Sequence, residues 1–233
     1  MTSPVTYAAQ GPVAVITMDD GKANALSHTM LGALEEALDR AAAENSAVVL
    51  AGREGKFCAG FDLKVMMSSP AAAGELVTRG AELCLRLYAF PRPVVAAATG
   101  HAMAAGALML LSSDTRIGTE GDFKLGLNET AIGLTLPAFA IALGRERLDP
   151  RRFTEPLIQA RIYSPAEAVA VGYLDEAVAP AEVLPRAVAE ATRLAALPGH
   201  AYAGTKAKLR GAFIASVRGA LVEDMGSLTN LPK

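Results

Sequence analysis

Residues 57–64 read Phe57-Cys58-Ala59-Gly60-Phe61-Asp62-Leu63-Lys64, and a second stretch of similar character, Gly100-His101-Ala102-Met103-Ala104-Ala105-Gly106-Ala107, follows later in the chain. Each comes after a predicted strand and consists largely of small residues. Small residues let the backbone approach a ligand closely, and amides at the start of a helix are unpaired donors at the positive end of its dipole. Together the two junctions could build an oxyanion hole. Either one alone is explained more simply by tight packing of a strand against a helix.

The first half of the chain alternates between predicted strands and predicted helices. Strands are expected at Val13–Met18, Ala47–Ala51, Val94–Thr99 and Thr115–Thr119, where apolar and β-branched residues run together. Helices are expected after the N-cap residue Ser27, at Leu76–Phe90 and at Ala105–Leu111, and residues 52–56 are expected to form a loop. The order β-α-β-α-β-α-β favours a parallel, right-handed α/β arrangement.

The second half is predominantly helical in pattern. Helices are predicted at Pro165–Val171, Ala181–Leu197 and Thr205–Met225, with one short strand at Asp175–Ala179. Neither a low-complexity linker nor an internal repeat separates the halves, although Pro198-Gly199 is a candidate hinge. The chain is therefore expected to act as one functional unit.

Composition excludes several classes of protein. The 233 residues carry 22 Lys plus Arg against 24 Asp plus Glu, a net charge of −2, which argues against nucleic-acid or polybasic membrane partners. The most apolar run, residues 94–111, is broken by glycines and is expected to be buried core rather than a membrane span. Only Cys58 and Cys84 are present and the three histidines are scattered, so no metal site is expected. With no visible targeting segment, these features favour a reducing, cytoplasmic location.

Common nucleotide and nucleophile motifs are missing from the sequence. Gly21-Lys22 lacks the upstream glycine of a P-loop, no GxGxxG follows the first strand, and no GxSxG occurs. Cys58 is assigned no catalytic role, because a free cysteine in such a chain is usually a packing residue. The two small-residue junctions are therefore the candidates for a catalytic site.

The two junctions, in this order and with a helix and strand between them, resemble the crotonase superfamily, the enoyl-CoA hydratase/isomerase family. Asn24-Ala25-Leu26 is similar to its NAL motif, residues 57–64 to F-x-A-G-x-D-L-K, and residues 93–100 to its approach strand. Asn128-Glu129-x-x-Ile132-Gly133 and Leu136-Pro137 also fit. The resemblance covers nearly the whole chain. It implies an α/β spiral of β-β-α repeats over residues 1–197 and a C-terminal helical trimerisation region over residues 198–233.

The resemblance also implies roles for individual residues. The backbone amides of Phe61 and Ala105 would form the oxyanion hole for an acyl-CoA thioester, and Asp62 would brace the loop. Lys22, Lys56 and Lys64 are candidates for the coenzyme A phosphates, with the backbone of residues 24–26 near the adenine, although lysines are more often simply solvated. The full implied set for substrate and coenzyme A is Lys22, Ala23, Asn24, Ala25, Lys56, Ala59, Gly60, Asp62, Lys64 and Leu108. Met66, Met67 and Leu134 are expected to line the acyl pocket.

The sequence departs from the family's two-glutamate pattern at one position. Hydratases of the family carry a first glutamate where this chain has Leu108, whereas Glu129 matches the second. A lone carboxylate in an apolar stretch should have a raised pKa, which suits a general base; the alternative is an exposed glutamate capping a turn. Pro137 stands where dienoyl-CoA isomerases and aryl-CoA dehalogenases place an aspartate.

One carboxylate suffices for a Δ3,Δ2-enoyl-CoA isomerisation, which is the expected activity. A weak enoyl-CoA hydratase and a non-catalytic acyl-CoA-binding protein are the alternatives. The resemblance implies no cofactor and no metal, an acyl-CoA thioester as the substrate, and a homotrimer or a dimer of trimers. The C-terminal stretch, residues 222–233, is shorter than the family's usual tail, so any contact with a neighbouring subunit's coenzyme pocket is in doubt.

Overall fold

The structure, a computed structural model, describes residues 3–228, with side-chain surroundings up to Leu221. Its main sheet has the strand order β1-β2-β3-β5-β7-β9 and a smaller sheet has the order β4-β6-β8. The strands are β1 (Val5–Gln10), β2 (Val13–Met18), β3 (Ala47–Gly52), β4 (Gly55–Cys58), β5 (Val94–Ala98), β6 (Gly100–Met103), β7 (Thr115–Thr119), β8 (Leu125–Gly126) and β9 (Glu176–Val178). Neighbouring strands are parallel, apart from the antiparallel hairpin of β1 and β2.

Helices surround both sheets. The α-helices are α1 (His28–Ala43), α2 (Leu63–Met66), α3 (Pro70–Ala89), α4 (Ala105–Leu111), α5 (Ala138–Arg147), α6 (Thr154–Leu157), α7 (Pro165–Val171), α8 (Val183–Ala195) and α9 (Gly199–Leu228), and the 3-10 turns are η1 (Thr130–Ile132), η2 (Pro150–Arg152) and η3 (Pro180–Glu182). Helix α8 ends and α9 begins on either side of the candidate hinge at Pro198. Of the predicted C-terminal region 198–233, residues 229–233 lie outside the described residues.

A β-β-α unit repeats along the chain, as the resemblance implies. Strand β3 of the main sheet leads to β4 of the small sheet and then to α2 and α3; β5, β6 and α4 repeat the order, and β7, β8 and α5 follow. The simple alternation expected from hydropathy was incomplete because it omitted the second strand of each unit. Of residues 52–56, expected in a loop, Gly52 belongs to β3 and residues 55–56 belong to β4. These strands are short and contain glycine, so their pairing depends on tertiary contacts rather than on an apolar run.

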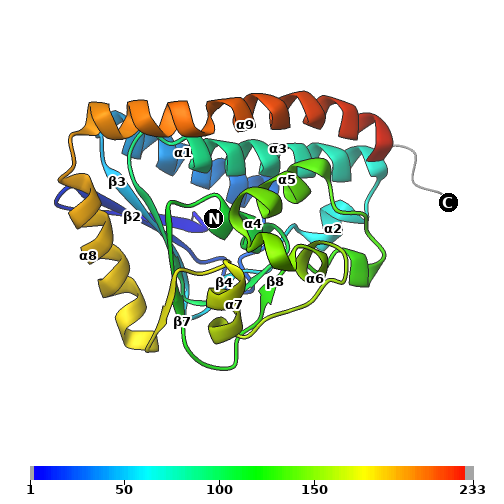
Figure 1. The fold of residues 1–233 in the computed structure, drawn as a ribbon, viewed down its shortest axis with the longest axis horizontal. Coiled ribbons are helices and arrows are strands. Elements are labelled where there is room, and N and C mark those ends of the chain that lie inside the picture. Colours follow the sequence, from blue (N-terminus) through cyan, green and yellow to red (C-terminus); the bar gives the residue numbers. More distant parts are fainter. Residues whose placement is uncertain (1–2, 229–233) are drawn as a thin grey trace.

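Buried residues lie on both faces of the main sheet. Side chains of β2, β3, β5 and β7 on one face pack against α8, and the other face belongs to the larger core beneath α1, α3 and α4 (Figure 1). All six residues of β3 and all five of β5 are consequently buried. Burial on both faces explains why these strands read as continuous apolar runs in the sequence.

Local signals set the helix boundaries. The Ser27 hydroxyl accepts a hydrogen bond from the Met30 amide at 3.2 Å, so α1 begins where predicted. Helix α3 begins earlier than the predicted Leu76, at Pro70, because Ser69 caps the Ala72 amide at 3.1 Å and proline suits the first turn. Its alanine-rich first turn has no apolar stripe to reveal it. Hairpin strand β1 was missed for a similar reason, since most of its residues are exposed.

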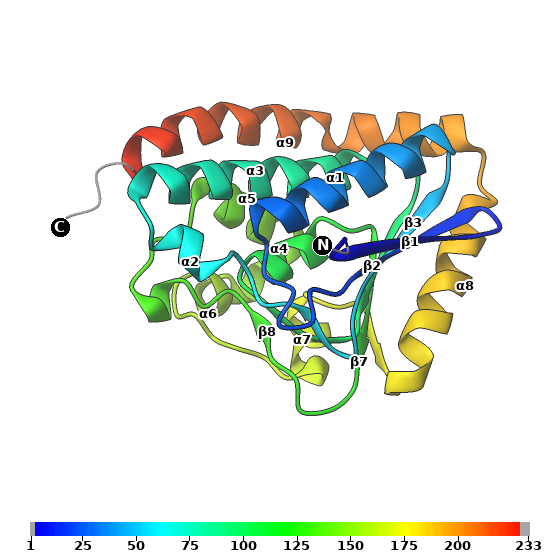
Figure 2. The same ribbon diagram turned by 180° about the vertical axis from the view of Figure 1, so that it is seen from behind.

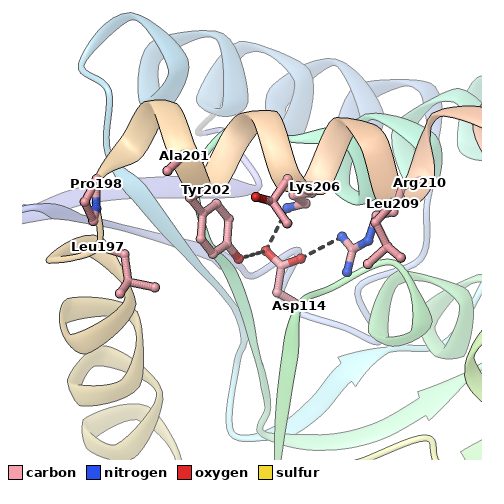
Figure 3. Close-up of a pocket in the computed structure, with 9 residues that line it drawn as sticks. Asp114, Leu197, Pro198, Ala201, Tyr202, Lys206, Leu209 and Arg210 are labelled. Atoms are coloured by element: carbon pink, nitrogen blue, oxygen red, sulfur yellow. Dashed lines mark hydrogen bonds and ion pairs between the residues drawn. The ribbon is translucent and has the colours of Figure 1, made fainter.

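Helix α9 runs alongside α3 and also contacts α5 (Figures 1 and 2). One carboxylate ties it to the core. The side chain of Asp114, just before β7, is only 9% exposed. It accepts hydrogen bonds from the Val94 amide at 2.8 Å and the Tyr202 hydroxyl at 2.9 Å. It also pairs with Lys206 and Arg210, each at 2.7 Å (Figure 3). Burial lowers the pKa of Lys206 to about 8 although Asp114 opposes the shift.

Asp114→Asn is therefore expected to destabilise the protein. The substitution leaves Lys206 and Arg210 buried without their counter-charge, a change that typically costs about 3–5 kcal/mol. Chemical denaturation measures the difference. Asp39→Asn is the matched control, because Asp39 pairs with Arg86 at 2.6 Å but its side chain is 72% exposed, and a surface pair contributes at most about 1 kcal/mol. Equal losses in the two variants would contradict the role assigned to Asp114.

Candidate active site

The loop between β2 and α1 supports the first small-residue junction through the fully buried Asn24. Its side-chain amide donates hydrogen bonds to the carbonyls of Met18 at 2.9 Å, Lys56 at 3.1 Å and Phe57 at 3.2 Å. The side-chain oxygen accepts from the Asp20 amide at 3.0 Å. Asn24 thus joins the end of β2 to β4, where the junction at residues 57–64 begins.

A short backbone ladder continues from this loop and leaves one amide free. The Leu26 amide donates to the Gly60 carbonyl at 2.8 Å, and the Asp62 amide donates to the Leu26 carbonyl at 3.1 Å. The Phe61 amide, between these two contacts, has no hydrogen-bond acceptor among the described residues. The ladder therefore fixes Phe61 while leaving its N–H available to a ligand.

The second junction presents a comparable amide beside the first. Ala105 is the first residue of α4, and its N–H also lacks an acceptor within the described part of the chain. Gly60 has a φ of +102°, and a Cβ built on it would lie 2.8 Å from the Ala104 Cβ and 3.6 Å from the Ala105 nitrogen. Only glycine fits this approach, which places the two free amides on adjoining segments. Ala104 itself has a φ of +52° and a ψ of −123°, a strained conformation for alanine.

These junctions border a cavity of about 280 Å³ at the end of the molecule away from α8. Its walls come from α2, α3, α4, η1 and the start of α5 and are mainly apolar. The lining residues are Ala59, Phe61, Leu63, Met66, Pro70, Ala73, Val77, Ala104, Leu108, Asn128, Glu129, Ile132, Leu134, Thr135, Pro137 and Phe139. Glu129 is the one ionisable side chain among them.

Glu129 is held in a tight turn by its own backbone. Its carbonyl accepts hydrogen bonds from the Ile132 amide at 3.1 Å and the Leu134 amide at 2.9 Å. The Glu129 carboxylate does not cap this turn, because it makes no hydrogen bond to the turn's first amides. It borders the cavity, and its Oε2 atom is buried with no hydrogen-bond partner in the described structure. Burial raises the pKa of the carboxyl above its ordinary value. The geometry therefore favours a general base over an exposed capping residue.

The cavity brings together part of the set expected from the sequence. Ala59, Phe61, Leu108 and Glu129 line it, and Leu108 is only 2% exposed. Met66 and Leu134 also line the cavity, but the expectation for Met67 was wrong, because its side chain is 84% exposed at the end of α2. Sequence reasoning missed Ala73 and Val77, whose four-residue spacing on one face of α3 was the available signal.

Apart from Ala59 and Leu108, the residues predicted for substrate and coenzyme A do not line this cavity. Lys22 and Lys64 are exposed and Lys56 is partly exposed on β4. Asp62 caps α2 by accepting a hydrogen bond from the Lys64 amide at 2.9 Å. The backbones of two other residues of the predicted set make hydrogen bonds within the protein. The Ala23 carbonyl accepts one from the Ala59 amide, and the Ala25 amide donates one to the Asp20 carboxylate. The coenzyme contacts of these residues stay predictions.

Other chemistry-bearing groups stand apart from the cavity. Cys58 and Cys84 are free and fully buried, and burial raises the pKa of each thiol to about 12. Over residues 3–228, no group of three or more His, Cys, Asp or Glu side chains is placed to hold a metal ion. Within the same range, no helix combines the length and apolarity required to cross a bilayer.

Fold and cavity together define a crotonase-type spiral, and comparisons with known proteins agree. The sequence pattern of the enoyl-CoA hydratase/isomerase family matches residues 8–224. The chain is similar to a crystal structure of a family protein from Pseudomonas syringae, with a TM-score of 0.95 and 38% identity over 97% of this chain and 98% of that one. It is 31% identical to a probable enoyl-CoA hydratase of Mycobacterium avium (strain 104), over 86% of this chain and 79% of the relative. It is also 32% identical to the human mitochondrial enoyl-CoA delta isomerase 1, over 86% of this chain and 68% of the relative. The chain belongs to the enoyl-CoA hydratase/isomerase family.

Gly60→Ala is expected to damage the site more than the fold. The added Cβ meets Ala104 and shifts the Phe61 amide, and losing one such donor typically lowers kcat by about 10²–10³-fold. Steady-state turnover of an enoyl-CoA substrate measures the effect. Gly11→Ala is the control, because Gly11 also has a positive φ, +58°, but has nothing within 4 Å of an added Cβ. Comparable kinetic losses in both variants would count against the close approach at Gly60.

Proposed function

We propose that the protein is a Δ3,Δ2-enoyl-CoA isomerase that works with Glu129 as its single acid-base group. The observation that carries the proposal is the composition of the cavity: Glu129 is its one ionisable lining residue, and Leu108 occupies the position where hydratases of the family carry their first glutamate. Names among the relatives do not separate isomerases from hydratases, since both are represented. The number of carboxylates in the cavity favours the isomerase.

In the proposed reaction Glu129 moves one proton between two carbons. The ionised carboxylate removes a proton from C2 of a 3-enoyl-CoA, and the electron pair of the broken C–H bond delocalises into a dienolate. The protonated carboxyl then returns the proton at C4, so that the double bond lies between C2 and C3. No water is consumed and no second acid is needed.

The two free amides would stabilise the charge that develops on the thioester oxygen. The N–H groups of Phe61 and Ala105 are already unpaired and held by the surrounding backbone, so they need little reorganisation when the enolate forms. Fixed donors of this kind typically lower such a barrier by about 3 kcal/mol each. The apolar walls strengthen these interactions by excluding water.

Hydration of an enoyl-CoA normally uses two carboxylates in this family, and this cavity has one. A water molecule must be activated and positioned at C3 while a proton reaches C2, and in the family pattern two carboxylates share these tasks. Asn128 and Thr135 are the other polar lining residues, and neither is an acid or a base near neutral pH. Slow hydration is therefore expected beside faster isomerisation.

Glu129→Gln is expected to abolish isomerisation while leaving binding intact. Removing a general base of this kind costs about 10²–10⁴-fold in rate, whereas glutamine preserves the size of the side chain. The assay follows the absorbance of the conjugated product formed from a 3-enoyl-CoA, and calorimetry reports acyl-CoA binding. Glu120→Gln, at an exposed position after β7, is the control and should retain full activity.

Two results would overturn the assignment to an isomerase. Rapid loss of the conjugated absorbance of a trans-2-enoyl-CoA would show hydration without a glutamate at position 108. Binding of acyl-CoA without turnover of either substrate, in both the wild type and Glu129→Gln, would instead identify an acyl-CoA-binding protein.

The pH dependence of isomerisation should follow the ionisation of Glu129. Burial raises its pKa, and the base must be ionised to accept the C2 proton, so kcat/KM is expected to fall as the pH drops through a value above the 4.5 of an ordinary glutamate. A pH–rate profile with a 3-enoyl-CoA tests this, with circular dichroism to confirm that the fold persists at each pH. A rate that stays constant down to pH 4.5 would contradict the prediction.

A further inference from the structure

Two of the buried polar atoms that lack a partner in residues 3–221 complement each other chemically. They are Glu129 Oε2 and the hydroxyl of Tyr173; the other two are guanidinium nitrogens of Arg92 and Arg147. A buried polar atom without a hydrogen bond typically costs about 1–3 kcal/mol, so such atoms require an explanation. A carboxylate oxygen only accepts hydrogen bonds and a neutral phenol donates one.

Tyr173 is linked through one neighbouring tyrosine to the strand that leads to Glu129. It follows Gly172 at the end of α7, its amide donates to the Ala168 carbonyl at 2.9 Å, and its side chain is fully buried. Its ring contacts that of Tyr163, with centroids 5.9 Å apart. Tyr163 in turn exchanges backbone hydrogen bonds with Leu125 of β8, the strand that leads directly to Glu129.

The charge of Glu129 acts on the phenol of Tyr173. Burial raises the pKa of Tyr173 most, and the neighbouring Tyr163 and the charge of Glu129 raise it further, while the Leu127 amide opposes the shift. Tyr173 therefore stays protonated and keeps its donor. The Tyr163 hydroxyl has a different acceptor, Glu155, at 3.5 Å, and Arg161 lies above its ring while Arg152 also acts on it. Within the described structure, these three groups and Glu129 are the charged groups that act on the two tyrosines.

We propose that Tyr173 is a positioning residue for Glu129, whose ionised Oε2 accepts a hydrogen bond from the Tyr173 hydroxyl. The two atoms form no hydrogen bond with each other in the structure; in the proposal, a rotation of the Glu129 side chain or one bridging water connects them. With Oε2 held from behind, Oε1 is the oxygen that faces the cavity and would both remove and return the proton. Tyr173 does not line the cavity, so it acts through Glu129 and not on the substrate. This inference rests on the proposed function of Glu129 as the base.

Tyr173→Phe removes the hydroxyl and preserves the ring. Because a donor to the ionised carboxylate lowers its pKa, removing the donor should move the acid limb of the isomerase pH profile upward by about one pH unit. We expect kcat to fall by about tenfold with KM unchanged. Tyr163→Phe is the matched control: it removes a neighbouring phenol hydroxyl that faces Glu155, and its acid limb should stay at the wild-type position.

A second measurement is independent of turnover. Carbon-13 NMR of protein labelled at glutamate side-chain carboxyls follows the titration of Glu129, whose signal is assigned by its loss in Glu129→Gln. A higher Glu129 pKa in Tyr173→Phe, but not in Tyr163→Phe, supports the proposal even if the wild type does not isomerise a 3-enoyl-CoA. An unchanged Glu129 titration in Tyr173→Phe overturns it, whatever the activity, and leaves Tyr173 as a packing residue.

Discussion

The candidate site depends on one buried amide, the side chain of Asn24. Its two N–H groups donate hydrogen bonds to three carbonyls, one at the end of β2 and two in β4. These hydrogen bonds tether the loop after β2 to the strand that precedes Gly60. Asn24 itself has a φ of +54°, a conformation that asparagine tolerates better than most residues. Without this tether the Leu26 ladder would have no fixed register against residues 60–62, and the Phe61 amide would lose its direction. A buried polar side chain thus sets the position of the backbone amide that is proposed to bind the thioester oxygen.

Close backbone approach then joins the two halves of the site. Gly60 lies against Ala104, and a Cβ on Gly106 would lie 2.3 Å from the Cys58 carbonyl oxygen, so β4 and the start of α4 are in direct contact. Ala104 retains an unfavourable backbone conformation in the middle of this contact. Strain of this kind costs about 1–3 kcal/mol and persists only where the surroundings determine the geometry. Here the surroundings are the apolar core beneath α3 and α4.

Sequence reasoning succeeded where the signal was local. Strand β2 and helices α4 and α7 have the predicted boundaries, because apolar runs, caps and glycines mark them. Strand β1 was missed because most of its residues are exposed and give no apolar run. The small sheet was missed because its short strands pair with segments that are distant in the sequence. The position of Glu129 was accessible through its motif, which names a residue and its neighbours. The surroundings of Glu129 could not be predicted in the same way. Tyr173 follows α7 and is linked to β8 through Tyr163, and the spacing of residues 129 and 173 in the sequence does not predict such a link.

Phe61 combines two functions that are chemically independent. Its amide belongs to the backbone and is unaffected by the identity of the side chain, whereas its ring lines the cavity and packs so closely against α3 that a Cβ on Gly80 would lie 2.3 Å from it. In the proposed mechanism, substitutions at this position would therefore alter which acyl chains fit while the charge-stabilising contact persists. The range of acyl chains accepted could then change during evolution without loss of activity. The side chain of Phe61 would determine selectivity, whereas its backbone amide would determine reactivity.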